Sequence, residues 1–156
     1  WLWRWEWGVD GFGAGGGGGW SEGDGPGSGI WFDLGPHLID QALQLFGLPE
    51  RVLASFGRQR LGALATDWAH VVLEYGPRRV ILHASMLVAG GSPRFVVHGD
   101  KGSLVKQAAD QQEAQLLAGM TSGAPGRGED ADPLLLYDGS GKTCSQLAVA
   151  ADQRRL

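Results

Sequence analysis

Three ionisable side chains stand around the start of an expected helix and could carry acid–base chemistry. Asp33 precedes the helix, His37 falls in its first turn, and Asp40 follows three residues later. A neutral histidine with a carboxylate partner can take a hydroxyl proton, because the carboxylate orients the imidazole ring. The positive end of the helix would disfavour the imidazolium form. Spacing alone favours a plainer interpretation, an ordinary polar first turn.

The helix that carries these residues is expected over residues 35–46. Pro36 suits a first helical turn, because the missing N–H has no partner there. Gly47 is typical of the residue after a helix, and Pro49 prevents continuation. Apolar residues recur at helical spacing between these limits, which predicts that one face of the helix packs against a core.

The clearest strands are expected at residues 67–75 and 79–88, which would form a hairpin that places His70 opposite His83. One face of the pair is purely apolar and should face the core. Its members are Ala69, Val71, Leu73, Tyr75, Val80, Leu82, Ala84 and Met86. Two histidines can ligate a metal, but no third ligand is evident nearby, so we expect no metal site. With Trp68, their face reads more naturally as a subunit contact or a wall that faces a ligand.

The remaining segments predict further strands and a short helix. Strands are expected at 1–7, 51–60, 94–98, 103–106 and 134–137, a short helix within 107–119, and mild helical character in the tail at 142–156. One main helix followed by several antiparallel strands predicts an α+β fold, an open, mostly antiparallel β-sheet with helices on one face. The chain has 156 residues, 43% of them hydrophobic, which suits one domain-sized core.

Two glycine motifs mimic phosphate-binding loops, and we expect neither to bind a cofactor. The pattern GxGxxG occurs at Gly11, Gly13 and Gly16, but more glycines follow it where a dinucleotide site needs a helix. The run at 141–143, Gly-Lys-Thr, ends like a P-loop. That loop requires glycine five residues before its second glycine, where this sequence has Leu136.

Charge and cysteine content exclude several classes of protein. The net charge is −4 and the charges are interspersed, so we expect no nucleic-acid partner. No apolar run approaches the roughly 20 residues of a membrane helix, so we expect no membrane partner. The single cysteine, Cys144, fits a reducing compartment and a cytoplasmic location. The first residue is Trp1 rather than Met, which is consistent with a piece of a longer protein.

A family resemblance strengthens the first interpretation of the acid–base residues. Residues 25–50 resemble the start of the C-terminal domain of the glucose–fructose oxidoreductase / inositol dehydrogenase (Gfo/Idh/MocA) family, whose Asp-x-Gly-x-His-x-x-Asp motif reads here as residues 33–40. The resemblance covers roughly 24–140. It implies that His37 is the catalytic acid/base, that Asp33 is its partner at the substrate hydroxyl, and that Asp40 supports the site.

The resemblance also implies what this chain does not carry. Family enzymes hold NAD or NADP in a separate Rossmann domain, and their catalytic lysine lies in a Glu-Lys-Pro segment. Both are absent here, and Lys101 reads as part of a hairpin turn. We therefore expect NAD or NADP only in a full-length protein, with no cofactor bound by this chain and no activity of the chain alone.

The expected organisation is an unmatched Trp/Gly-rich segment (1–23), a substrate and oligomerisation domain (24–141) and a tail (142–156). The resemblance implies a small polyol or sugar substrate and a homo-oligomer that forms through the sheet. The compositional break near residue 24 also fits a truncated or frame-shifted reading of a longer gene. Two alternatives stay open: a free-standing, non-enzymatic sheet module for self-association or ligand binding, and a gene fragment without a function of its own.

Overall fold

One β-sheet and two helices make up the part of the chain that the structure describes. This computed structural model covers residues 2–8, 23–108, 111–140 and 143–147. The elements in chain order are β1 (Leu2–Gly8), α1 (Ile30–Phe46), β2 (Arg51–Gly57), β3 (Trp68–Tyr75), β4 (Arg78–Ser85), β5 (Phe95–His98), β6 (Gly102–Lys106), α2 (Gln112–Leu117), β7 (Leu134–Asp138) and β8 (Thr143–Leu147).

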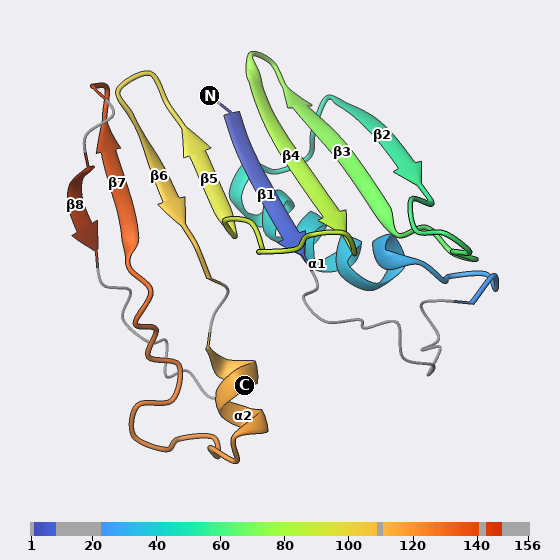
Figure 1. Ribbon diagram of the computed structural model, residues 1–156. Helices are drawn as coiled ribbons and strands as arrows, with labels where there is room; N and C mark the ends of the chain where they lie inside the picture. The colour runs from blue at the N-terminus through green and yellow to red at the C-terminus, as the bar shows by residue number, and fades with distance from the viewer. Residues whose placement is uncertain (1, 9–22, 109–110, 141–142, 148–156) are drawn as a thin grey trace.

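The sheet is open and almost entirely antiparallel, as predicted. Its eight strands lie in the order β2-β3-β4-β1-β5-β6-β7-β8. The exception is β1, which pairs parallel to β4 and antiparallel to β5. Figure 1 shows β1, in dark blue, between these two strands. The strand predicted at residues 1–7 is therefore confirmed, and it joins the two halves of the sheet.

The hairpin of β3 and β4 has the predicted register. His70 pairs with His83, and Glu74 pairs with Arg79. Burial alternates along both strands, since successive side chains point to opposite faces of a sheet. The apolar side chains therefore share one face. We call the opposite face, which carries His70 and His83, the open face.

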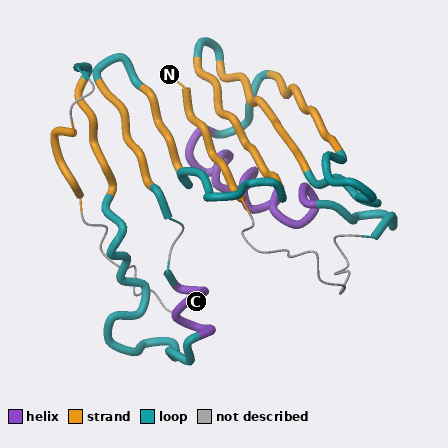
Figure 2. Tube along the Cα trace, viewed as in Figure 1, coloured by secondary structure: helices purple, strands orange, loops and turns teal. Residues whose placement is uncertain are grey.

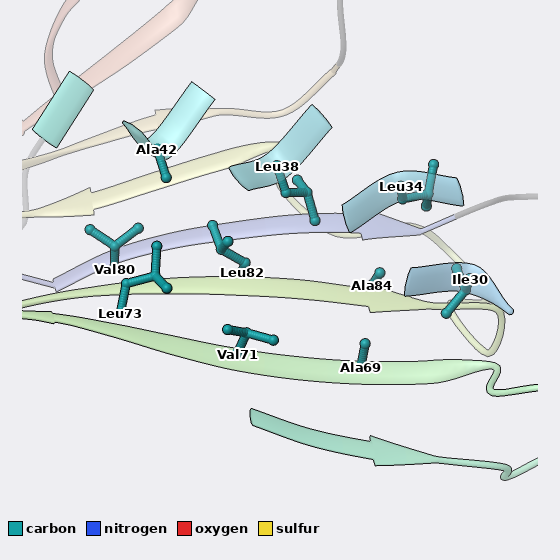
Figure 3. Close-up of a cluster of buried hydrophobic side chains, with 10 residues drawn as sticks. All are labelled: Ile30, Leu34, Leu38, Ala42, Ala69, Val71, Leu73, Val80, Leu82 and Ala84. Carbon is teal, nitrogen blue, oxygen red and sulfur yellow. The ribbon is translucent and has the colours of Figure 1, made fainter. Parts of the chain in front are cut away.

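The core lies where α1 packs against β3 and β4. Figure 3 shows a stripe on α1 at four-residue spacing above apolar side chains of the two strands. The ten buried members are Ile30, Leu34, Leu38, Ala42, Ala69, Val71, Leu73, Val80, Leu82 and Ala84. Burying each Leu, Ile or Val side chain contributes about 1.5–3 kcal/mol. This contact fixes the rotation of α1 about its axis, and with it the direction of the side chains on its other faces.

Helix α1 begins at Ile30, five residues before the predicted start. Packing explains the difference, because Ile30 and Leu34 extend the buried stripe towards the N-terminus. Pro36 therefore lies inside the helix. It lacks the N–H that would bond the carbonyl of Phe32, but both residues are exposed, so water can hydrate that carbonyl.

Part of the tail departs from the helical character predicted for 142–156, while residue 142 and residues 148–156 lie outside the described residues. Residues 143–147 form β8, paired antiparallel with β7, and are not helical. A short helix is marginal in water, whereas a strand can satisfy the free edge of β7. The predicted short helix is present as α2, which Figure 2 shows beyond the strand ends, so α1 alone covers a sheet face. Neither helix in the described part of the chain has the length and apolarity to cross a bilayer.

Candidate functional site

A stripe of polar side chains runs along an exposed side of α1. It consists of Asp33, His37, Asp40 and Gln44, which we call the polar stripe. Steps of three and four residues place them on one side of the helix. All four are exposed, since the apolar stripe turns them away from β3 and β4. The Gln44 side-chain amide donates a hydrogen bond to Asp40 Oδ2 at 2.6 Å. The structure thus brings the three predicted site residues to one surface.

The early start of α1 changes the electrostatics expected for this surface. Asp33 lies in the first helical turn, where the N-terminal N–H groups favour a negative charge. His37 is the eighth residue of the helix, and the effect of the helix dipole fades after the first turn. The prediction that His37 occupies the first turn is therefore wrong. The helix dipole acts on the carboxylate instead of the imidazole.

A buried carboxylate, Asp67, fixes the loop that meets the start of α1. Asp67 is 1% exposed and accepts hydrogen bonds from the backbone N–H groups of Gln59 and Arg60, at 2.7 and 2.9 Å. The Arg60 guanidinium lies 3.1 Å from the same carboxylate. Burial alone would raise the pKa of Asp67, but these hydrogen bonds and this charge hold it below its ordinary value. At the end of the loop, the carbonyl of Thr66 accepts the N–H of Ile30 at 2.8 Å.

Sequence reasoning did not identify Asp67 as a residue that supports the candidate site. Its partners are backbone amides in a loop, and no periodicity or motif indicates such contacts. The only available signal was an acidic residue immediately before a strongly apolar strand.

Gly35 allows an aromatic ring to pack along the same helix. A Cβ atom at Gly35 would lie 2.8 Å from ring atoms of Trp31, one turn earlier. The Trp31 ring in turn lies 5.7 Å from the ring of Phe56 on β2. The glycine of the 33–40 motif therefore leaves room for the Trp31 ring, which packs between α1 and Phe56 on the edge strand β2.

The open face carries an apolar row and a histidine pair. The row has two parts, each made of register neighbours: Leu53, Val72 and Ile81 on β2, β3 and β4, and Val96, Val105 and Leu135 on β5, β6 and β7. Between the two parts, Arg4 of β1 is the register partner of both Ile81 and Val96. Leu53 is exposed and the other five are half-buried. In the next register position, His70 and His83 approach to 3.4 Å between their Nδ1 atoms. No described helix covers this face.

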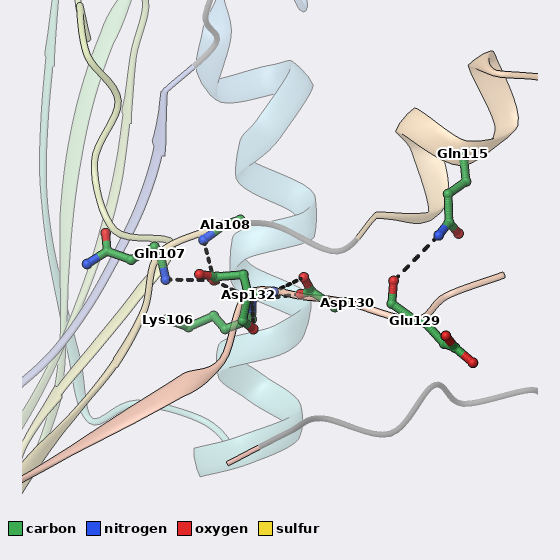
Figure 4. Close-up of polar contacts among 7 residues, drawn as sticks. All are labelled: Lys106, Gln107, Ala108, Gln115, Glu129, Asp130 and Asp132. Carbon is green, nitrogen blue, oxygen red and sulfur yellow. Dashed lines mark hydrogen bonds and ion pairs between the residues drawn. The ribbon is translucent and has the colours of Figure 1, made fainter. Parts of the chain in front are cut away.

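A second buried charge cluster ties a long loop to the end of β6. Figure 4 shows Lys106 between Asp130 and Asp132. Its Nζ atom lies 2.6 Å from Asp130 Oδ2 and 2.5 Å from Asp132 Oδ2. Burial would lower the pKa of Lys106, but the two carboxylates raise it above its ordinary value. Burial would likewise raise the pKa of Asp132. The hydrogen bond from the backbone N–H of Ala108 and the charge of Lys106 nevertheless hold this pKa below its ordinary value.

The other motifs singled out in the sequence add nothing to this site. Gly11, Gly13 and Gly16 fall outside the described residues, as does the start of the run at 141–143. Lys101 lies in the turn between β5 and β6, as predicted, where the N–H of Gly99 bonds the carbonyl of Gly102 at 2.8 Å. Over the described ranges, no group of three or more His, Cys, Asp or Glu could hold a metal ion.

Comparison with known proteins places the chain in one family. Residues 11–152 match the sequence profile described as the oxidoreductase family (Gfo/Idh/MocA), C-terminal alpha/beta domain. The Escherichia coli protein YdgJ, named as an uncharacterized oxidoreductase, is 53% identical over 92 residues, which is 59% of this chain and 27% of YdgJ. The Bacillus subtilis protein IolW, named scyllo-inositol 2-dehydrogenase (NADP⁺), is 41% identical over 59% of this chain and 26% of its own length.

The fold likeness extends over almost the whole chain. A crystal structure from Klebsiella pneumoniae, of a protein described as an oxidoreductase, superposes with a TM-score of 0.81 at 51% identity. It covers 97% of this chain and 40% of the Klebsiella chain. The chain therefore spans well under half the length of the proteins that it matches.

Proposed function

Because the chain belongs to the Gfo/Idh/MocA oxidoreductase family, as its C-terminal alpha/beta domain, we propose that it supplies the substrate and assembly surfaces of an NAD(P)-dependent oxidoreductase. The proposed substrate is a sugar-like or cyclitol molecule with a hydroxyl on the reacting carbon. The name of IolW, which specifies scyllo-inositol and NADP⁺, supports this substrate class and this cofactor class.

The polar stripe is the observation that carries the proposal. Asp33 and His37 lie one helical turn apart on α1, and both are exposed on a helix whose apolar side is fixed against the sheet. A substrate that reaches this side of α1 meets a carboxylate and an imidazole together. This arrangement suits recognition of a hydroxyl group, since carboxylate and imidazole both hydrogen-bond to hydroxyls.

The two residues would divide the acid–base work. His37 would take the hydroxyl proton as the substrate is oxidised and return it in the reverse direction, since imidazole exchanges protons near neutral pH. Asp33 would hold the substrate hydroxyl and stabilise the protonated imidazole. Asp40, which accepts the hydrogen bond from Gln44, would support the stripe.

The described residues do not fit a dinucleotide. A dinucleotide site needs a strand, a glycine-rich turn and a helix, followed directly by a second strand that runs parallel to the first. Here the strand that follows α1 is β2, which lies at the edge of the sheet and pairs only with β3. The only parallel pair in the described sheet, β1 with β4, is separated in the chain by α1, β2 and β3. We therefore assign no cofactor contact to this chain. NAD or NADP would accept the hydride when bound by another part of a longer protein.

The test is NADP⁺-dependent oxidation of scyllo-inositol by the complete gene product that contains this chain and by the 156-residue chain alone. We expect turnover by the complete protein and none by the chain. His37→Gln should lower kcat by about 10²–10⁴-fold, the usual contribution of acid–base catalysis. His98→Gln is the matched control, since His98 is an exposed histidine on β5. Turnover by the chain alone, or equal loss in both variants, would refute the assignment.

We also propose that two copies associate through their open faces. The two parts of the apolar row lie on either side of β1, and contact with water raises the free energy of aliphatic side chains that stay partly exposed. Ion pairs flank the row, with the Glu74 carboxylate 3.3 Å from Arg79 and 3.6 Å from Arg51. An apolar centre with a polar rim is the usual composition of a subunit interface.

Sedimentation velocity tests this assembly. Val105→Glu places a charge between the apolar partners Val96 and Leu135 and should convert the oligomer to monomer, because burying an unpaired charge costs several kcal/mol. Leu45→Glu is the control, since Leu45 is also exposed but lies on α1. A strictly monomeric wild-type chain would exclude both the proposed oligomer and a module that self-associates.

A further inference from the structure

The two histidines on the open face form a close pair that bridges neighbouring strands. His70 on β3 and His83 on β4 are register partners, and their Nδ1 atoms lie 3.4 Å apart. The ring of Trp68 stacks on His70 at 6.0 Å and meets His83 edge-on at 5.6 Å. The three rings therefore form one cluster on the two strands that also carry most of the core.

The separation of the two nitrogens matches the edge of a tetrahedral metal site. Zinc–imidazole bonds of 2.0–2.1 Å at the tetrahedral angle place two ligand nitrogens about 3.3–3.4 Å apart. The observed separation is 3.4 Å. This spacing suits a cation shared by both Nδ1 atoms, which would replace the hydrogen bond between them.

We propose that His70 and His83 chelate one divalent transition cation of the Zn²⁺ class through their Nδ1 atoms. Neutral imidazole is a favoured ligand of Zn²⁺, Ni²⁺ and Cu²⁺. The imidazole whose proton lies on Nδ1 shifts to the tautomer protonated on Nε2, so binding by the neutral pair releases no proton. The cation would link β3 to β4 across the open face.

The surroundings determine how the cation completes its coordination. The register neighbours of the pair are Ser55 on β2 and Glu6 on β1. Within the described part of the chain no third His, Cys, Asp or Glu joins the two imidazoles in a metal-binding group. We expected no metal from the sequence because a third ligand was missing. The Nδ1 separation is the observation that changes this inference, which does not depend on the proposed enzymatic function.

Calorimetric titration of Zn²⁺ into the full chain tests the site. All titrations use a Cys144→Ser background, because Cys144 is the only cysteine and a potential zinc ligand. We expect one Zn²⁺ per chain, at least tenfold weaker binding in His70→Gln and in His83→Gln, and unchanged binding in His98→Gln and His37→Gln. Unchanged binding in the first two variants, or equal weakening in all four, would overturn the proposal.

Two further measurements keep all four histidines, so their results do not depend on whether the histidine variants fold. In side-chain ¹⁵N spectra, Zn²⁺ should shift the Nδ1 signals of two histidines and leave the other two in place. Ni²⁺ should quench the tryptophan fluorescence contributed by Trp68, and Trp68→Phe should remove that part of the quenching. Zinc shifts at Nε2 atoms, or equal shifts at all four histidines, would contradict chelation through Nδ1.

Discussion

Replacing Asp67 with Asn should destabilise the domain and loosen the start of α1. The carboxylate accepts two backbone N–H groups and the Arg60 guanidinium while only 1% exposed. A hydrogen bond to a charged group contributes about 1.5–3 kcal/mol, and breaking a buried ion pair costs about 3–5 kcal/mol. Asn keeps the volume and one acceptor oxygen but turns an NH₂ group towards donors. We therefore expect a loss of about 3 kcal/mol in the free energy of unfolding.

Urea unfolding at neutral pH, followed by circular dichroism, measures this loss. In a chain of this length it corresponds to a decrease in Tm of about 6–12 °C. Asp100→Asn is the matched control, since Asp100 is exposed in the β5–β6 turn and should change stability by less than about 0.5 kcal/mol. Hydrogen exchange adds a local readout: the amide of Ile30, bonded to Thr66, should exchange faster in Asp67→Asn, and the amide of Leu82 in β4 should change less.

The pH dependence gives a second check with a definite sign. The folded pKa of Asp67 lies below its ordinary value of 3.8, so the carboxylate stabilises the folded state above that pH. This contribution disappears as the pH falls through the folded pKa. The gap between wild type and Asp67→Asn should therefore be full at pH 7 and narrow below about pH 4. A gap under about 1 kcal/mol at neutral pH, or one that widens in acid, would refute the assigned role.

Two further substitutions test the packing and charge arguments. Lys106→Met leaves the half-buried carboxylates of Asp130 and Asp132 without their cation, so the free energy of unfolding at pH 7 should fall by about 3 kcal/mol. Because Lys106 helps to hold the pKa of Asp132 below its ordinary value of 3.8, this loss should shrink as the pH falls below about 4, and an equal loss at both pH values would contradict the ion-pair explanation. Gly35→Ala should lower the free energy of unfolding by about 1–3 kcal/mol in thermal unfolding, although Ala favours helix, because its Cβ would lie 2.8 Å from the Trp31 ring. A stabilised variant would show that the ring moves freely.

Side-chain alternation and turn chemistry predicted the central hairpin, including its register. The apolar face of 67–75 and 79–88 could pack in only one way, since a one-residue slip would expose every core side chain. His70 and His83 then had to lie opposite each other. Their Nδ1 separation was not predictable, because it depends on rotamers that the pattern does not specify.

The start of α1 and the nature of the tail depended on long-range contacts. Pro36 is a strong local signal for a first turn, but burial of Ile30 and Leu34 outweighs it and moves His37 away from the helix start. Residues 143–147 have little preference for either helix or strand, and they form a strand because they pair with the edge of β7. Asp67 was missed for the same reason, since its partners belong to a loop. The roles assigned to Asp33, His37 and Asp40 stay predictions.

The position of β1 has a consequence for how the chain folds. Strand β1 is made first, but its partners on β4 and β5 begin at Arg79 and Phe95. At a synthesis rate of about 5–20 residues per second, β1 waits roughly 4–15 seconds for the first of them. Once β4 is made, the hairpin and α1 can form a local unit before β1 docks, and until then one edge of β4 has no neighbour. The β1 of another copy could pair with that edge, so we expect strand exchange between copies when the protein folds at high concentration.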